Sequence, residues 1–196
     1  MDTAVPRDAL GPAPARGVAR PDAAPGGGTL AAHRFRRVLG RFPTGVVLVT
    51  ADTPDGPTGM AVNSFTSVSL DPPLVSFCAA RTSSTWPRIR VTGAFSVNIL
   101  GEDHAGLSRR FAQKGADRFA GLGHRPGGTG APVLDGVAAH LDCELHDVHE
   151  AGDHVIVLGR VVHLDADERV RPLVFHGGDY CGLQSSAAPS SRAGAL

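Results

Sequence analysis

Residues 46–80 read VVLVTADTPDGPTGMAVNSFTSVSLDPPLVSFCAA, and this stretch decides the class of fold. Residues 46–51 form a β-branched run of strand length. A cluster of turn-forming residues follows, and residues 58–68 return as a second strand, so a hairpin is expected. Residues 71–73 then break the chain before a third strand at 74–80. Consecutive strands joined by short turns indicate antiparallel β structure.

The rest of the chain adds further strands and a few short helices. Apolar spacing and capping residues predict helices at 30–42, 83–91 and 102–113, and strands at 95–100, 137–145, 155–164 and 173–175, with a Gly/Pro loop at 125–132. Long crossover helices between the strands are missing. The pattern therefore favours a mainly β fold, a closed or half-closed antiparallel barrel with short flanking helices, over a parallel α/β sheet.

The position of the aromatic residues sets the domain boundaries. All of them lie between Phe35 and Tyr180, whereas both ends of the chain are rich in Ala, Gly, Pro or Ser. Such ends cannot bury enough apolar surface to offset their ordering entropy. We expect a disordered N-terminal tail at residues 1–29, one folded domain at 30–184 and a flexible C-terminal tail at 185–196.

Charge and cysteine content narrow the class of partner. The chain of 196 residues has 19 basic and 19 acidic residues and a net charge of zero, which argues against binding of nucleic acid or an anionic membrane by bulk electrostatics. Neither a signal-peptide pattern nor an apolar run of membrane length occurs in it. Three cysteines far apart in sequence then indicate reduced thiols and a cytoplasmic location.

Two polar clusters flank the predicted strand at 74–80. The first, in a strand-like stretch, comprises Asn63, Ser64, Thr66, Ser67 and Ser69. It is either an exposed edge with solvated hydroxyls or a wall that offers donors and acceptors to a planar heteroaromatic ligand such as a flavin. The second comprises Arg81, Ser83, Ser84 and Thr85 at a predicted helix start. It is either an ordinary helix cap or a phosphate cradle. One elongated ligand could reach both.

Histidines supply two further candidates. His154, in the sequence Ala-Gly-Asp-His before a strand, is either structural or a hydrogen-bonding group for a carboxamide or phosphate of a second substrate. His140, Asp142, Glu144 and His146 alternate with apolar residues and are expected to form a solvated or subunit-facing row. One ion would reach at most two neighbours of that row, so we expect no metal site there.

Five motifs together carry a family resemblance. They are FPTGVV at 42–47, GMAVNSFTSVSLDPPLV at 59–75, GAFSVN at 93–98, LSRRFA at 107–112 and AGDH at 151–154. In this order they resemble the flavin reductase family with the FMN-binding split-barrel fold, the reductase components of two-component flavin-dependent monooxygenases. The resemblance covers residues 35–183.

The resemblance implies a homodimeric NAD(P)H:flavin oxidoreductase that passes reduced flavin to a partner monooxygenase. Hydride would pass from nicotinamide C4 to flavin N5, with FMN or FAD as flavin and NADH or NADPH as co-substrate. The implied flavin residues are Thr44, Asn63, Ser64, Phe65, Thr66, Ser67, Ser69, Ala80, Arg81, Ser83, Ser84, Thr85, Phe111 and Lys114. The implied nicotinamide residues are Phe42, Pro43, His154 and Tyr180, with His154 orienting the nucleotide rather than transferring a proton.

Two other functions fit a similar barrel. A pyridoxamine-phosphate-oxidase type of enzyme would need a basic pocket for a phosphorylated amine. A flavin-binding or electron-transfer protein without turnover would retain its flavin and oxidise no nicotinamide nucleotide in the steady state. Oxidation of NADH or NADPH with free flavin as acceptor, without an amine substrate, separates the flavin reductase from both alternatives.

Overall fold

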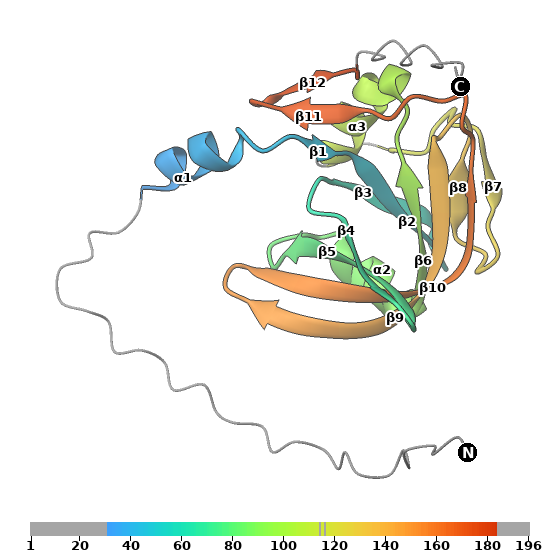
Figure 1. Ribbon diagram of the computed structural model, residues 1–196. Coiled ribbons are helices and arrows are strands. Elements are labelled where there is room, and N and C mark those ends of the chain that lie inside the picture. Colours follow the sequence, from blue (N-terminus) through green and yellow to red (C-terminus); the bar gives the residue numbers. More distant parts are fainter. Residues whose placement is uncertain (1–30, 114, 116, 184–196) are drawn as a thin grey trace, which may run out of the picture.

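The computed structural model describes residues 31–113, 115 and 117–183 (Figure 1). Its helices are α1 (Ala32–Leu39), α2 (Trp86–Thr92) and α3 (Ala105–Ala112), with a 3-10 turn η1 (Glu102–His104) before α3. Its strands are β1 (Thr44–Gly45), β2 (Val47–Thr53), β3 (Gly56–Val62), β4 (Thr66–Leu70), β5 (Pro73–Ala80), β6 (Ala94–Ile99), β7 (His124–Pro126), β8 (Pro132–Leu134), β9 (Ala139–Ala151), β10 (His154–Ala166), β11 (Val174–His176) and β12 (Asp179–Cys181). The predicted tails, at 1–29 and 185–196, lie outside the described residues, and so does Lys114. Of the predicted domain at 30–184, the described part is 31–113, 115 and 117–183.

A seven-stranded antiparallel sheet forms the body of the molecule. Its strand order is β3-β2-β6-β9-β10-β5-β4, so β3 and β4 follow each other in sequence but lie at opposite edges of the sheet. Residues 63–65 join the two edges, and β3 contacts β5 across the gap (Figure 1). The sheet is therefore rolled up without a continuous hydrogen-bonded ladder between its edges, and the predicted split β-barrel is confirmed.

The prediction of one strand over residues 58–68 is wrong. That stretch forms two strands, because the chain leaves the sheet after Val62 and enters the opposite edge at Thr66. The Ser64 hydroxyl accepts a hydrogen bond from the Cys78 backbone N–H at 2.8 Å. A side chain thus replaces backbone pairing at the crossing, and the connection is tied to the C-terminal half of β5.

The predicted Gly/Pro loop at 125–132 also contains strand structure. β7 and β8 pair as a small hairpin around residues 127–131. Asn98, which is completely buried, accepts the Leu134 N–H through Oδ1 at 2.8 Å and donates through Nδ2 to the Thr50 hydroxyl at 3.0 Å. These long-range bonds hold the hairpin against the main sheet, and a local reading of Gly and Pro could not foresee them.

This hairpin changes the environment of the polar row on β9. Glu144 and His146 are exposed as expected, but His140 and Asp142 are 4% and 0% exposed. The Gly128 backbone N–H donates to Asp142 at 2.6 Å. The prediction of a solvated row is therefore wrong at its first two members, because residues of the β7–β8 hairpin cover them.

Two clusters of apolar side chains stabilise the barrel. In the first, the Phe77 ring meets Trp86 and Phe95 edge-on, with ring centroids 5.8 and 5.6 Å apart. In the second, Phe111 of α3 meets Phe119 edge-on at 5.2 Å. These aromatic contacts add to the burial of apolar area. Both helices contact β2 and β3, so the two clusters fix α2 and α3 against this part of the sheet.

Helix α1 is the exception to this packing. The structure places it at 32–39, within the predicted 30–42, and none of its residues is buried. Its apolar side chains Phe35, Val38 and Leu39 are 52%, 58% and 56% exposed. Figure 1 shows α1 standing away from the sheet, so its apolar face is uncovered in the single chain.

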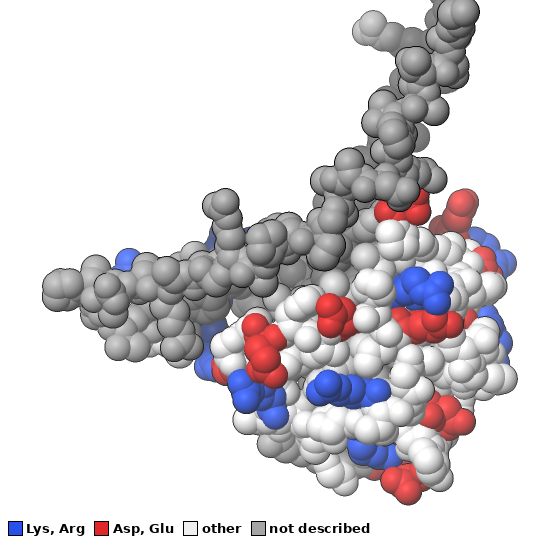
Figure 2. All heavy atoms as spheres, turned by 90° about the horizontal axis from the view of Figure 1, so that it is seen from below, with Lys and Arg blue, Asp and Glu red and all other residues white. Residues whose placement is uncertain are grey.

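Charges are mixed over the surface, in keeping with the zero net charge. On the face that Figure 2 shows, acidic and basic side chains alternate without a large patch of one sign. Among the described residues, the helices are all too short or too polar to cross a membrane.

Candidate functional site

The first predicted polar cluster lies on the connection between the two sheet edges and on β4. Asn63, Ser64, Thr66 and Ser67 are exposed, whereas Phe65 and Ser69 are half-buried. The Phe65 ring packs against the first core cluster and anchors the segment. The exposed amide and hydroxyl groups stand beside the split, where a planar ligand would find donors and acceptors.

The second polar cluster follows β5 and leads into α2. Ser83 Oγ accepts the backbone N–H groups of Thr85 and Trp86 at 3.2 and 3.1 Å, so Ser83 provides the cap of the helix start. The Thr85 hydroxyl is buried and accepts a hydrogen bond from Arg118 at 3.0 Å. Ser84 remains exposed, so it is the serine of this cluster whose hydroxyl is open to a ligand.

A hollow of about 430 Å³ adjoins this cluster. Its wall includes Ser84 and Thr85 together with Arg88, Arg118 and Asp117. Arg118 also donates to the Gly59 carbonyl at 2.7 Å, which fixes its guanidinium beside β3. The sequence analysis missed Arg88 and Arg118. The available signal was that Arg88 lies three residues after Thr85, the end of the Ser/Thr cluster, and that Arg118 lies six residues after the LSRRFA motif.

The Gly-Asp-His turn meets the second cluster across the sheet. His154 is paired with Ala80 in the register of β10 and β5, and the Arg81 N–H donates to the Asp153 carbonyl at 3.0 Å. His154 Nδ1 lies 2.7 Å from an Asp153 carboxylate oxygen. This hydrogen bond lowers the pKa of Asp153. The carboxylate holds one ring nitrogen, which leaves Nε2 as the nitrogen available to a ligand.

Arg81 has a partner of its own in the single chain. Its guanidinium forms an ion pair with Glu150 at 2.9 Å, and both side chains are mostly exposed. Exposed pairs of this kind contribute little to stability, about 0–1 kcal/mol. An anionic ligand can therefore displace Glu150 at small cost.

A third group of predicted residues surrounds a small hollow of about 190 Å³. Asn63 from the flavin set and Tyr180 from the nicotinamide set both line it, along with Val46, Ala61, Val62, Ser108 and Phe175. The Tyr180 hydroxyl lies 2.8 Å from Ser108 Oγ, and the Arg109 guanidinium lies 4.9 Å from the centre of the Tyr180 ring. These contacts fix the orientation of the tyrosine ring.

Thr44 lies beside this hollow, and Phe42 and Pro43 directly precede it in the sequence. Thr44 on β1 is paired with Phe175 on β11, and its hydroxyl oxygen is buried without a hydrogen-bond partner among the described residues. An unsatisfied buried hydroxyl is a group that a bound ligand would satisfy. Phe42 is 73% exposed and Pro43 is also exposed. The residues present thus fit a ligand with polar ring atoms.

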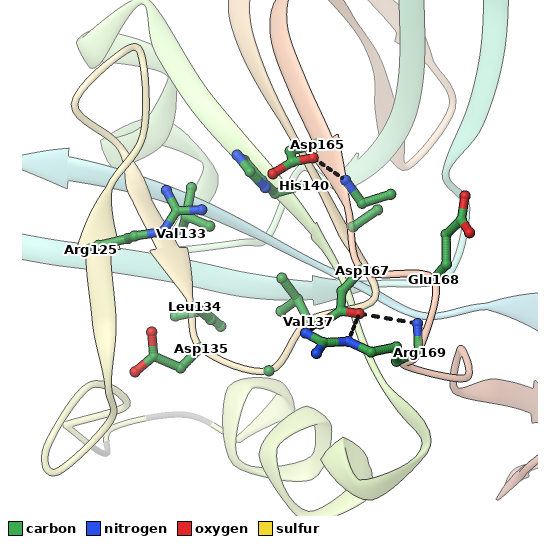
Figure 3. A pocket seen from close by; sticks show the side chains of 13 residues that line it. Arg125, Val133, Leu134, Asp135, Val137, His140, Asp165, Asp167, Glu168 and Arg169 are labelled. Atoms are coloured by element: carbon green, nitrogen blue, oxygen red, sulfur yellow. Dashed lines mark hydrogen bonds and ion pairs between the residues drawn. The ribbon is translucent and has the colours of Figure 1, made fainter.

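Not every predicted site residue lies at these hollows. Phe111 is 2% exposed in the second core cluster, and its ring would lie 2.9 Å from a Cβ at Gly59. It supports β3 from within the core in the single chain, and a direct flavin contact stays a prediction. A larger hollow of about 550 Å³, shown in Figure 3, is lined by none of the predicted flavin or nicotinamide residues.

Comparison with known proteins identifies the family of the chain. Residues 39–184 match the model of the flavin reductase like domain. A flavin reductase of Pseudomonas putida is 51% identical over 150 residues, which cover 76% of this chain and 88% of that protein. The reductase subunit HsaB of a flavin-dependent monooxygenase from Rhodococcus jostii is 43% identical over 152 residues, which cover 78% of each chain.

A solved structure shows the same fold. It is the NADH:FAD oxidoreductase SgcE6 of Streptomyces globisporus in complex with NAD and FAD fragments, which is 37% identical to this chain. The TM-score is 0.75, and the match covers 79% of this chain and 94% of that one. The chain belongs to the flavin reductase family, and its predicted fold class and activity are confirmed at that level.

Proposed function

We propose that this chain, an NAD(P)H-dependent flavin reductase, holds FMN or FAD along β5 and the nicotinamide nucleotide between His154 and Tyr180. The observation that carries the proposal is the register of β5 and β10. It sets His154, from the nicotinamide set, opposite Ala80 and beside Arg81, from the flavin set. Two substrates bound by these residues would meet at one place.

Different exposed polar residues would bind the ring system and the phosphate of the flavin. Asn63 and Ser67 offer an amide and a hydroxyl to the ring system, while Ser84 and Arg81 offer a hydroxyl and a positive charge to the phosphate. Ser83 and Thr85 support the site indirectly, since their hydroxyls already accept hydrogen bonds from Trp86 and Arg118. Lys114, which lies outside the described residues, stays a proposed flavin residue on the grounds of the family resemblance.

The protein's task in the reaction is orientation. Bound flavin supplies the hydride-accepting centre, so no side chain needs to act as acid or base. His154 Nε2 and the Tyr180 ring hold the nicotinamide nucleotide, with Phe42 and Pro43 at its border. Fixing two rings in contact converts a bimolecular encounter into a reaction within one complex.

A homodimer would complete this site. The described chain leaves the site residues in separate, open hollows, and it exposes the apolar face of α1. A helix of this length is marginal in water unless tertiary contacts cover it. A second copy that covers α1 would also enclose the nearby Phe42 and Pro43.

The partner that uses the product is a flavin-dependent monooxygenase. The support is the relative from Rhodococcus jostii, which is itself named as a reductase subunit of such an enzyme. Reduced flavin would pass between the two proteins by release and capture. All three cysteines of the chain are free thiols, which supports a cytoplasmic location.

Steady-state oxidation of NADH and of NADPH, with FMN, FAD and riboflavin in turn, tests the proposal. We expect nucleotide oxidation that depends on added flavin and needs no amine substrate. If the phosphate contacts contribute, riboflavin will show a higher KM than FMN. Tightly retained flavin with no steady-state oxidation would instead support the electron-transfer alternative, and a strict need for a phosphorylated amine would support the oxidase.

A further inference from the structure

A compact group of metal-binding side chains lies away from the proposed flavin site. His140 and Asp142 come from β9, and His163 comes from the neighbouring strand β10, where it is paired with Asp142. One ligand atom of each residue lies within 4.8 Å of the others. The sequence row on β9 supplies only two of these ligands, and the third becomes visible only when the register of the two strands is known.

The distances suit one ion after a small adjustment. His163 Nδ1 lies 3.6 Å from Asp142 Oδ2. Two nitrogen or oxygen ligands at about 2.1 Å from a tetrahedral ion are separated by about 3.4 Å. The pair is therefore already at the spacing of neighbouring ligands, and the His140 ring is tilted against the His163 ring with centroids 5.7 Å apart.

Burial and hydrogen bonding prepare the two ligands on β9. The His140 side chain is nearly completely buried, and its Nε2 has no hydrogen-bond partner among the described residues. Asp142 is held in place by Ser96 Oγ on one oxygen and by the Gly128 N–H on the other. Such outer contacts orient metal ligands.

The surroundings would attract a cation. The hollow of Figure 3, which His140 lines, has more acidic than basic side chains. The acidic ones are Asp135, Asp165, Asp167 and Glu168, and the basic ones are Arg125 and Arg169. Arg169 is paired with Asp167. Figure 3 shows Asp165 beside His140, and the two are directly paired across the strands. Asp165 is not among the three clustered residues, so a water molecule would supply the fourth ligand.

We propose that His140, Asp142 and His163 bind one divalent transition-metal ion of the Zn²⁺ class. Imidazole and carboxylate ligands suit this class of ion. The bound ion would tie the β7–β8 hairpin, through Asp142 and Gly128, to β9 and β10. Its role would be structural, because His163 lies nine residues along β10 from His154, about 30 Å at 3.3 Å per residue.

Cobalt titration of the chelator-treated, full-length chain tests this site. We expect one Co²⁺ per chain, with the strong visible absorption of a four-coordinate ion, and displacement by one equivalent of Zn²⁺. The variant His163→Ala should weaken binding more than about 100-fold, because loss of an outer-shell partner alone costs about 10–100-fold. His146→Ala is the matched control, since His146 is an exposed histidine on the neighbouring strand β9 and lies outside the cluster.

A second measurement keeps the test independent of enzyme turnover. Zn²⁺ should raise the thermal unfolding temperature of the native chain and of His146→Ala but not of His163→Ala. If His163→Ala does not fold, His163→Asn takes its place in the same measurement. Flavin reduction by all these variants should be unchanged. Less than one ion bound per chain, or equal binding by His163→Ala and the native chain, would overturn the proposal and leave the cluster as a hydrogen-bonded support for the hairpin.

Discussion

His154 is held by its neighbour in sequence. The Asp153 carboxylate bonds its Nδ1, and the backbone of the same turn accepts the Arg81 N–H. Its side chain is 45% exposed, which leaves the ring reachable for a nucleotide. The ring is thus held in one orientation and is open to a ligand.

Replacing His154 by alanine should therefore weaken nucleotide binding. We expect the KM for the nicotinamide nucleotide to rise about 10-fold, corresponding to about 1.4 kcal/mol for one lost hydrogen bond to a polar or charged group. The flavin Kd should change little. Steady-state kinetics and a flavin fluorescence titration measure the two effects, with His146→Ala as control. An unchanged nucleotide KM would remove His154 from the site.

Neighbouring serines at the start of α2 should separate stability from binding. Ser83→Ala removes the hydroxyl that caps two backbone N–H groups, so we expect a loss of about 1 kcal/mol in the free energy of unfolding. Ser84→Ala should leave stability unchanged and weaken FMN binding several-fold. Urea unfolding and flavin titration of both variants provide the comparison. Equal flavin affinity of Ser84→Ala and the native chain would contradict the phosphate assignment.

Single residues could be named from the sequence only where a motif marked them. The Ser/Thr cluster and the Gly-Asp-His turn were visible as motifs, but which serine caps the helix depends on backbone geometry. Arg118 reaches Thr85 across the fold, and its partners are far away in sequence. Such long-range contacts leave no local pattern.

At the scale of the elements, α3 depends on a glycine in β3. A Cβ at Gly59 would lie 2.9 Å from the Phe111 ring and 3.0 Å from the Val49 carbonyl oxygen. Both distances are shorter than ordinary carbon contacts. The close approach lets the second core cluster form beneath the candidate site, and it explains why a residue without a side chain occupies this strand.

Adding a methyl group at Gly59 should loosen this packing. We expect Gly59→Ala to lower the free energy of unfolding by about 1–3 kcal/mol, the usual cost of overpacking. Gly106→Ala is the matched control, because a Cβ at this position in α3 meets nothing within 4 Å. It should stabilise the chain by about 0.5–1 kcal/mol. Thermal or urea unfolding measures the change in the free energy of unfolding for each variant. Equal changes for the two substitutions would contradict the packing argument.

Strand positions were predictable where a local run of residues marks them. They were predicted wrongly where they depend on pairing with distant segments. Alternating and β-branched runs gave β2, β5, β6 and β10 in their places. The separation of β3 from β4 follows from the barrel's split, where Ser64 bonds Cys78, and the burial of His140 follows from the β7–β8 hairpin. The break between β3 and β4 and the burial of His140 both depend on contacts between distant segments, and the sequence alone does not show which segments meet.

For the whole molecule, the uncovered apolar surface predicts self-association. Besides α1, Phe42 and Leu70 are 73% and 93% exposed. We expect a dimer by light scattering, and we expect the double variant Phe35→Asp and Leu39→Asp to weaken it, with Arg34→Ala as the control on the same helix. A native chain that is monomeric at the concentrations used for kinetics would contradict the dimer.

The proposed reaction transfers hydride from a nicotinamide nucleotide to a flavin that binds and dissociates in each turnover. The most direct measurement is anaerobic mixing of a small amount of the chain with excess FMN or FAD and excess NADH or NADPH. We predict that the visible absorbance of oxidised flavin disappears over many turnovers, with one nucleotide oxidised for each flavin reduced. Bleaching that stops at one flavin per chain, or no bleaching beyond the rate without protein, would contradict it.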